Sequence, residues 1–182
     1  LLLKNIAFDE YLRDSSLSLL SDHILPLLKN YRANQILWHK YIEPKSLLAF
    51  KTLSEVRNIN ELVDKLRGNY EKSALLSRQH FYDVIEAHPL TLEQRLAAIR
   101  DNDRNLILAA AGTGKTSVMV AKALDLLHRQ TATADKVLIL AYNKEAANEL
   151  SSRFSQCASR LSGAFSGKLS IKARQGVSEN NG

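Results

Sequence analysis

The chain has 182 residues, of which 45% are hydrophobic and 24% are charged, and its formal net charge is +6. This composition is typical of a globular protein and excludes an intrinsically disordered one. The longest apolar stretches, near residues 106–111 and 137–142, are too short to span a bilayer. The single cysteine, Cys157, excludes an internal disulfide and fits a reducing compartment, so we expect a cytoplasmic protein without membrane association. Five scattered histidines lack partners at ligand spacing and predict no zinc-type metal site.

Residues 1–88 are predicted to form a helical N-terminal region. Nine of the twelve aromatic residues lie here, and the apolar residues of segment 59–70 recur at helical spacing after a capping Asn58 or Asn60. The aromatic residues fit either a packed core or a partner-binding face, and core packing is the better interpretation. Proline at positions 26 and 44 divides the region into shorter helices, and Pro89 closes it.

Residues 89–174 are predicted to begin an α/β domain. Apolar segments 106–110 and 137–141 read as buried parallel strands, and segments 91–100, 115–129 and 144–154 read as helices. A weak third strand is predicted at 168–173. This order is the start of a doubly wound fold, an incomplete parallel sheet with flanking helices. Residues 175–182 are polar and aperiodic, and we expect a disordered or truncated end there.

A phosphate-binding loop connects the first predicted strand to the following helix. Its residues, Ala109-Ala110-Ala111-Gly112-Thr113-Gly114-Lys115-Thr116, fit the Walker A pattern. Glycine allows the backbone to curl so that consecutive N–H groups face one phosphate, and the helix N-terminus faces the same anion. Lys115 is placed to reach the β- and γ-phosphates, and Thr116 to ligate Mg²⁺. We therefore predict a site for ATP and Mg²⁺ that consists of residues 109–116, the adjoining Ser117, and the catalytic side chains Lys115 and Thr116.

Three pieces of sequence occur in a fixed order. They are Pro89-Leu90-Thr91-Leu92-Glu93-Gln94-Arg95, then Leu106–Thr116, then residues 140–153, which read LAYNKEAANELSSR. Together they resemble the opening of superfamily 1 DNA helicases of the UvrD/Rep type, whose ATP-binding domain is RecA-like. Within that family the likeness is strongest to the helicase IV branch, because a helix of the Phe-Tyr-Asp-x-x-Glu kind, here 81–86, precedes the first piece. The resemblance covers about residues 80–153.

The resemblance implies roles for three further residues. Gln94 matches the glutamine that contacts adenine through its amide, although Thr91-x-x-Gln94 also fits a helix capping box, and both roles are compatible. Tyr142 matches an aromatic residue that lies along single-stranded DNA, and Arg153 matches a basic position that meets a DNA phosphate. Glu145 departs from the family, which usually has lysine there. Segment 151–182 has a net charge of +4, which fits either nucleic acid binding or a solubilising tail.

The function that the resemblance implies is an ATP-dependent DNA helicase that moves 3′→5′ on single-stranded or partly duplex DNA. In this family ATP hydrolysis needs an Asp-Glu pair at the end of an apolar strand, and no such strand follows the P-loop in this sequence. It also needs arginine fingers, which a second RecA-like lobe supplies. We therefore expect this chain to be a fragment, without the C-terminal helicase lobes, that is inactive in ATP turnover by itself. Two alternatives stay open: another P-loop NTPase or kinase, and a non-catalytic DNA-binding or interaction module with a vestigial P-loop.

Overall fold

The computed structural model describes residues 9–161 and 170–173. The predicted character of residues 175–182 falls outside the described residues. The chain divides into two compact units, which we call the helical unit (Leu1–Ser77 and Ile99–Leu106) and the P-loop unit (Arg78–Ala98 and Ile107–Gly182). The domain boundaries expected from the sequence, at residues 88 and 174, remain predictions.

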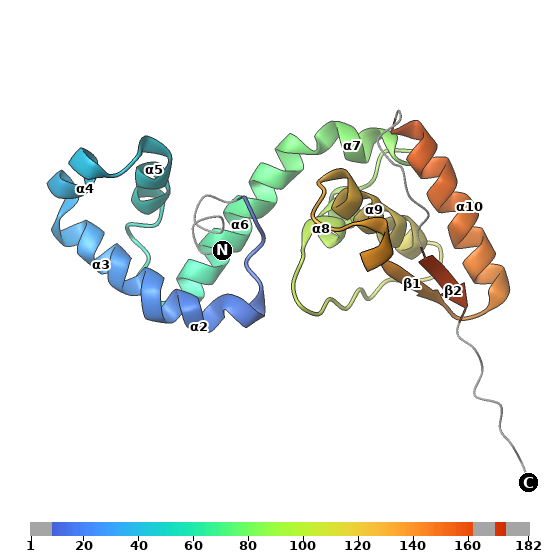
Figure 1. The fold of residues 1–182 in the computed structure, drawn as a ribbon, viewed down its shortest axis with the longest axis horizontal. Coiled ribbons are helices and arrows are strands. Elements are labelled where there is room, and N and C mark those ends of the chain that lie inside the picture. The colour runs from blue at the N-terminus through green and yellow to red at the C-terminus, as the bar shows by residue number, and fades with distance from the viewer. Residues whose placement is uncertain (1–8, 162–169, 174–182) are drawn as a thin grey trace, which may run out of the picture. The chain divides into compact units, whose positions relative to one another are not determined.

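The helical unit consists of short helices and one long helix, in agreement with the helical region predicted for this part of the chain (Figure 1). A 3-10 turn at Asp14–Ser16 leads into α2 (Leu17–Leu19) and a π-helical turn at Leu20–Ile24. The four helices that follow are α3 (Leu25–Ala33), α4 (Gln35–Tyr41), α5 (Pro44–Thr52) and α6 (Ile59–Ser77).

Helix α6 forms because its apolar residues recur at helical spacing and because a capping residue precedes its first turn. Leu62, Leu66, Tyr70 and Ala74 recur every four residues and are all buried, so they form one apolar face. The predicted cap is confirmed, since the Asn58 side chain accepts a hydrogen bond from the Glu61 N–H at 3.0 Å.

Three aromatic residues of the helical unit pack against one another, which confirms the predicted core packing for these three. The Trp38 and Phe50 rings meet edge-on with centroids 4.6 Å apart, and Tyr31 adjoins both. Tyr31 and Phe50 are buried, whereas Tyr41 at the end of α4 is 71% exposed.

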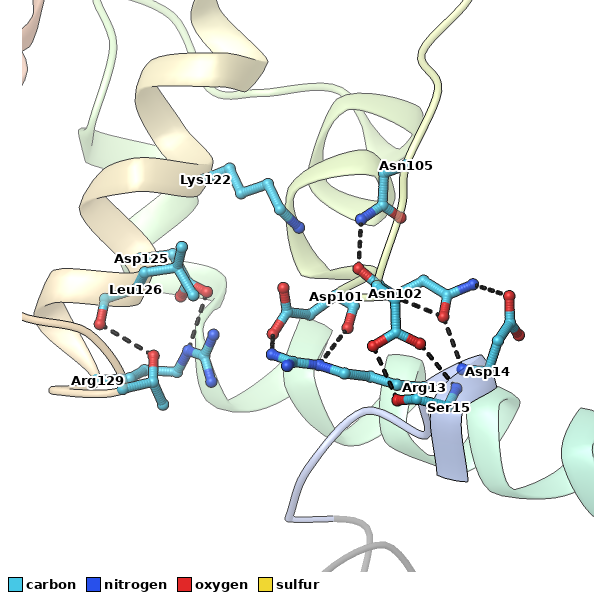
Figure 2. Close-up of polar contacts among 12 residues, drawn as sticks. Arg13, Asp14, Ser15, Asp101, Asn102, Asn105, Lys122, Asp125, Leu126 and Arg129 are labelled. Atoms are coloured by element: carbon cyan, nitrogen blue, oxygen red, sulfur yellow. Dashed lines mark hydrogen bonds and ion pairs between the residues drawn. The ribbon is translucent and has the colours of Figure 1, made fainter. Parts of the chain in front are cut away.

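Polar contacts hold segment 101–105 against residues 13–15 of the helical unit. Figure 2 shows Arg13 donating to Asp101, at 3.0 Å to its carbonyl and 2.7 Å to its carboxylate. The Asp14 N–H donates to the Asn102 side chain at 2.8 Å, and the Ser15 N–H donates to Asp103 at 2.7 Å. The Ser15 N–H and hydroxyl lower the pKa of Asp103. The polar turn predicted for 101–105 thus anchors the chain immediately before the P-loop segment.

The P-loop unit combines helices with a two-stranded parallel sheet (Figure 1). Its elements are α7 (Gln79–Val84), α8 (Leu92–Ile99), α9 (Lys115–His128), a 3-10 turn (Ala134–Lys136), β1 (Leu138–Ala141), α10 (Lys144–Arg160) and β2 (Ser170–Ala173). β1 pairs with β2 from Leu138↔Ser170 to Ala141↔Ala173, and α10 packs against both strands and α9. The predicted helices are confirmed, although α10 extends six residues beyond 154. The weak third strand is confirmed at 170–173, and positions 168–169 lie outside the described residues.

The first predicted strand, 106–110, is wrong. These residues lie outside regular secondary structure, and Leu106 and Leu108 are 85% and 86% exposed. An apolar segment becomes a parallel strand only beside sheet neighbours, and in the described part of the chain β1 and β2 pair only with each other. β1 is covered on one face alone: Ile139 and Ala141 are buried, whereas Leu138 and Leu140 are exposed.

A buried ionic cluster fixes the C-terminal half of α9. The Asp125 carboxylate, 1% exposed, accepts from Arg78 at 3.1 Å and from Arg129 at 2.9 Å; Figure 2 shows the Arg129 contact. Burial, followed by the charge of Asp125, raises the pKa of the nearby Tyr82 phenol. Arg78 belongs to the turn before α7, so the cluster holds the helix behind the P-loop against the chain that precedes it.

Candidate nucleotide-binding site

The loop before α9 has the backbone that a phosphate cradle requires. Gly112 and Gly114 have φ angles of +76° and +87°, in the left-handed region that side chains disfavour, so the backbone conformation predicted for these two glycines is confirmed. Ala111 and Gly112 form a turn, and Gly114 is the N-cap residue of α9. The first N–H groups of α9 have no carbonyl partner within the helix, so this end is suited to bind an anion.

Lys115 folds back over its own loop. Its Nζ donates to the carbonyl oxygens of Ala109 and Ala110, each at 2.7 Å. Lys115 is exposed, and Thr116 beside it is half-buried. The ammonium group therefore lies at the mouth of the loop, bound to neutral acceptors that a phosphate group, which carries charge, is able to replace.

Gln94 joins the start of α8 to the P-loop. Its side-chain oxygen accepts from the Thr91 N–H at 2.9 Å, and the Gln94 N–H donates to the Thr91 hydroxyl at 3.4 Å, so the capping box is present. Its side-chain Nε2 donates to the Thr113 carbonyl at 3.1 Å. The approach is close: a Cβ on Gly114 would lie 2.4 Å from Nε2 of Gln94. The cap and the contact with the loop therefore occur together.

Helix α8 is itself held in place by Arg95. Its guanidinium donates to the Leu90 carbonyl at 2.7 Å and to the Asp83 carboxylate at 2.6 Å. Asp83 lies on α7, so this one side chain connects α7, the segment 85–90 and α8. The position of Gln94 is thus set by packing and not by its cap alone.

These elements enclose a pocket of about 620 Å³. One wall is the P-loop and the first turn of α9, and the other is segment 86–91 with Gln94. Arg153 reaches the pocket from α10. The volume is that of a typical small-molecule site. The pocket brings together most of the predicted nucleotide residues: Gln94, Gly112, Thr113, Gly114, Lys115, Thr116 and Ser117.

Arg153 lies in this pocket with two partners that the sequence did not suggest. Its Nε donates to the Glu86 carboxylate at 3.0 Å, and one terminal nitrogen donates to the Ser117 hydroxyl at 3.0 Å. The Arg153 side chain is 36% exposed and that of Glu86 is 12% exposed. Glu86 also adjoins Cys157, where burial first and this carboxylate second raise the thiol pKa to about 11. The only sequence signal for Glu86 was its place in the segment 81–86.

Tyr142 occupies the position expected of it, directly after β1, and is 84% exposed. Its predicted contact with DNA, like that of Arg153, stays a prediction. Within the described residues no group of three or more His, Cys, Asp or Glu side chains is arranged to hold a metal ion. No helix in that part of the chain has the length and apolarity needed to cross a membrane.

Comparison with known proteins points to one family. Residues 90–175 match the UvrD/REP helicase N-terminal domain. DNA helicase IV of Escherichia coli strain K12 is 38% identical over 84 residues, which are 46% of this chain and 12% of that protein. A probable DNA helicase II homolog of Rickettsia conorii is 33% identical over 66 residues, 36% of this chain and 10% of the homolog. DNA helicase II of Rickettsia typhi is 35% identical over 66 residues, again 36% of this chain and 10% of that helicase.

The matches thus span a small part of each relative, and no solved structure matches the chain significantly. The matched segment contains the whole P-loop, and with it the pocket residues Gln94, 112–117 and Arg153. The resemblance seen in the sequence is therefore confirmed: residues 90–175 match the UvrD/REP helicase N-terminal domain.

Proposed function

We propose that the pocket binds ATP with Mg²⁺ and that the chain is the ATP-binding part of a DNA helicase of the UvrD/Rep type. The observation that carries the proposal is the P-loop itself: two glycines with positive φ open α9, and Gln94 lies against the same loop in one pocket. A Cβ at Gly114 would collide with Gln94, so glycine at this position allows Gln94 to lie directly against the loop. Lys115 and Thr116 also supply the ammonium group and the hydroxyl that the phosphates and Mg²⁺ require, which supports the same conclusion.

Each residue then has a distinct task. The N–H groups of residues 112–116 bind phosphate oxygens, and the Lys115 ammonium leaves the carbonyls of Ala109 and Ala110 to neutralise the β- and γ-phosphates. Thr116 ligates Mg²⁺, which supplies charge neutralisation when bound. Gln94 exchanges its contact with Thr113 for the adenine edge, because its amide both donates and accepts.

The wider mechanism follows from the family. ATP binding and hydrolysis would drive movement 3′→5′ along single-stranded DNA, with Tyr142 stacking on a base from the end of β1. We propose that β1 and β2 are the beginning of a RecA-like sheet and that α10 is the helix that connects them. Because no strand that ends in Asp-Glu follows the P-loop in this sequence, we expect the chain alone to bind nucleotide with little or no turnover. The kinase and vestigial-loop alternatives have no supporting observation of their own.

The test is a titration of the 182-residue chain with a fluorescent ATP analogue and Mg²⁺, followed by ATP turnover with and without single-stranded DNA. Lys115→Ala should weaken nucleotide binding by at least about tenfold, the loss of a charged hydrogen bond. Lys136→Ala is the matched control, because it also removes one exposed lysine charge, but from a residue that does not line the pocket. Equal affinity in the chain and the Lys115→Ala variant would refute binding at the P-loop. Turnover that DNA stimulates and Lys115→Ala abolishes would refute the expected inactivity.

A further inference from the structure

Arg153 lies at the nucleotide pocket although its sequence motif suggested DNA. Its guanidinium donates to the hydroxyl of Ser117, the residue that follows Thr116 in the first turn of α9. A Cβ on Gly114 would lie 3.7 Å from that same hydroxyl and 2.4 Å from Nε2 of Gln94. Ser117 and Gln94 therefore lie on one side of Gly114, and Arg153 approaches the loop from this side.

This side of the loop differs from the side that Lys115 serves. Lys115 reaches the carbonyls of Ala109 and Ala110, at the start of the loop, whereas Gln94 contacts Thr113 near its end. If Gln94 marks the base and Lys115 marks the terminal phosphates, Arg153 lies near the base, the ribose and the first phosphate. This step rests on the function proposed above.

The state of the Arg153 side chain fits a ligand contact. Glu86 and Ser117 fix its orientation through two nitrogen atoms, which reduces the entropy lost on binding. The side chain is still 36% exposed and lines the pocket. A planar guanidinium binds phosphate oxygens through paired N–H groups and stacks on aromatic rings. Arg153 is therefore suited to bind either the phosphate or the base of a nucleoside monophosphate unit.

We propose that Arg153 is a nucleotide-binding residue that contacts the nucleoside end of ATP and ADP, and that Ser117 and Glu86 position it. In this arrangement the motif after β1 supplies DNA contact through Tyr142 and nucleotide contact through Arg153. The two side chains come from opposite ends of the motif: Tyr142 precedes α10, and Arg153 lies ten residues into the helix.

The competing explanation is that Arg153 only neutralises Glu86. Arg153→Ala alone does not separate the two, because it leaves the nearly buried Glu86 carboxylate beside a phosphate site and repels the ligand. The decisive comparison uses the Glu86→Gln background, in which that charge is absent. There the proposal expects Arg153→Ala to weaken both ADP and ATP by at least about tenfold and by the same factor. If Arg153 only neutralises Glu86, Arg153→Ala should leave the affinity for ADP and ATP unchanged in that background. This result would overturn the proposal.

Three further variants complete the design. Arg153→Lys retains the charge without the planar fork and should bind with intermediate affinity, and it keeps the test open if Arg153→Ala does not fold. Arg160→Ala is the matched control, since it removes a guanidinium from α10 that donates to the Ile85 carbonyl. Lys115→Ala tests the proposed function separately: if it weakens ATP and Arg153→Ala does not, only the inference about Arg153 fails.

Affinity for single-stranded oligonucleotides is measured in parallel on the same proteins. The proposal expects Arg153→Ala to leave that affinity within about twofold of the parent chain, because Arg153 then makes no DNA phosphate contact, whose loss would weaken DNA binding at all sequences. A fall in DNA affinity with nucleotide affinity unchanged would overturn the proposal and return Arg153 to the DNA-binding surface.

Discussion

Gly114 offers a sharp test of how the P-loop and Gln94 fit together. Gly114→Ala places a Cβ in a backbone conformation with φ of +87° and 2.4 Å from Nε2 of Gln94. The left-handed conformation costs alanine about 1–2 kcal/mol. Gln94 must also move, which removes its 3.1 Å hydrogen bond to the Thr113 carbonyl, a loss of about 1 kcal/mol. We therefore expect the free energy of unfolding to fall by about 2–3 kcal/mol.

Gly112→Ala is the matched control. Gly112 has φ of +76°, but nothing lies within 4 Å of its added Cβ, so this variant carries the backbone cost alone. The difference between the two variants, about 1 kcal/mol, isolates the contact with Gln94. Urea unfolding followed by far-UV circular dichroism is the suitable assay, because the single tryptophan, Trp38, lies in the helical unit and does not report on the loop.

A double-variant cycle gives the refutation. In a Gln94→Ala background the collision is absent, so Gly114→Ala and Gly112→Ala should cost the same. An excess cost of Gly114→Ala that persists in that background, or no excess in the parent chain, would show that the close approach of Gln94 to the loop is not as described.

Three other predictions concern stability, pH and thiol reactivity. Asp125→Ala should lower the free energy of unfolding by about 3 kcal/mol because it removes the buried carboxylate to which both Arg78 and Arg129 donate; Asp135→Asn, at an ion pair exposed to solvent, should have no measurable effect, and equal costs would contradict this reasoning. The pKa of Asp103 is lowered in the folded chain, so its stabilising effect is present above its ordinary value of 3.8 and is lost as the pH falls through the folded value. The urea midpoint should therefore drop as the pH falls below about 3.8, and it should drop less in Asp103→Asn; an identical drop would exclude this contribution. Burial raises the pKa of the Cys157 thiol to about 11, so a thiol reagent at about pH 8 should label the unfolded chain quickly and the folded chain hardly at all. Equal labelling rates would place Cys157 at the surface.

The P-loop and its neighbours are the part of the site that sequence reasoning predicted well. The glycines at 112 and 114, the helix from Lys115 and the capping box at Thr91 all depend on local backbone preference, which short sequence patterns determine. The strand at 138–141 followed from a run of apolar residues in the same way, whereas the strand at 170–173 followed from a weaker pattern in which polar and apolar residues alternate.

The failure at 106–110 has a physical cause. Leu106, Ile107 and Leu108 have strand-like composition, but a strand exists only through its neighbours, and the described residues supply none beside this segment. Likewise the exposed faces of Leu138 and Leu140 depend on what covers the sheet, which is a property of the assembled layers.

By itself, then, the sequence determined the phosphate loop, the order of helices and the likeness to UvrD/Rep helicases, because these depend on residues adjacent along the chain. Only the tertiary structure decided which distant side chains meet: Gln94 with Thr113, Arg78 with Asp125, and Arg153 with Glu86 and Ser117. Such pairs are set by how α7, α9 and α10 pack, and side-chain identity alone does not specify the partner. The same arginine can meet DNA or nucleotide, and its position beside Ser117 favours the nucleotide.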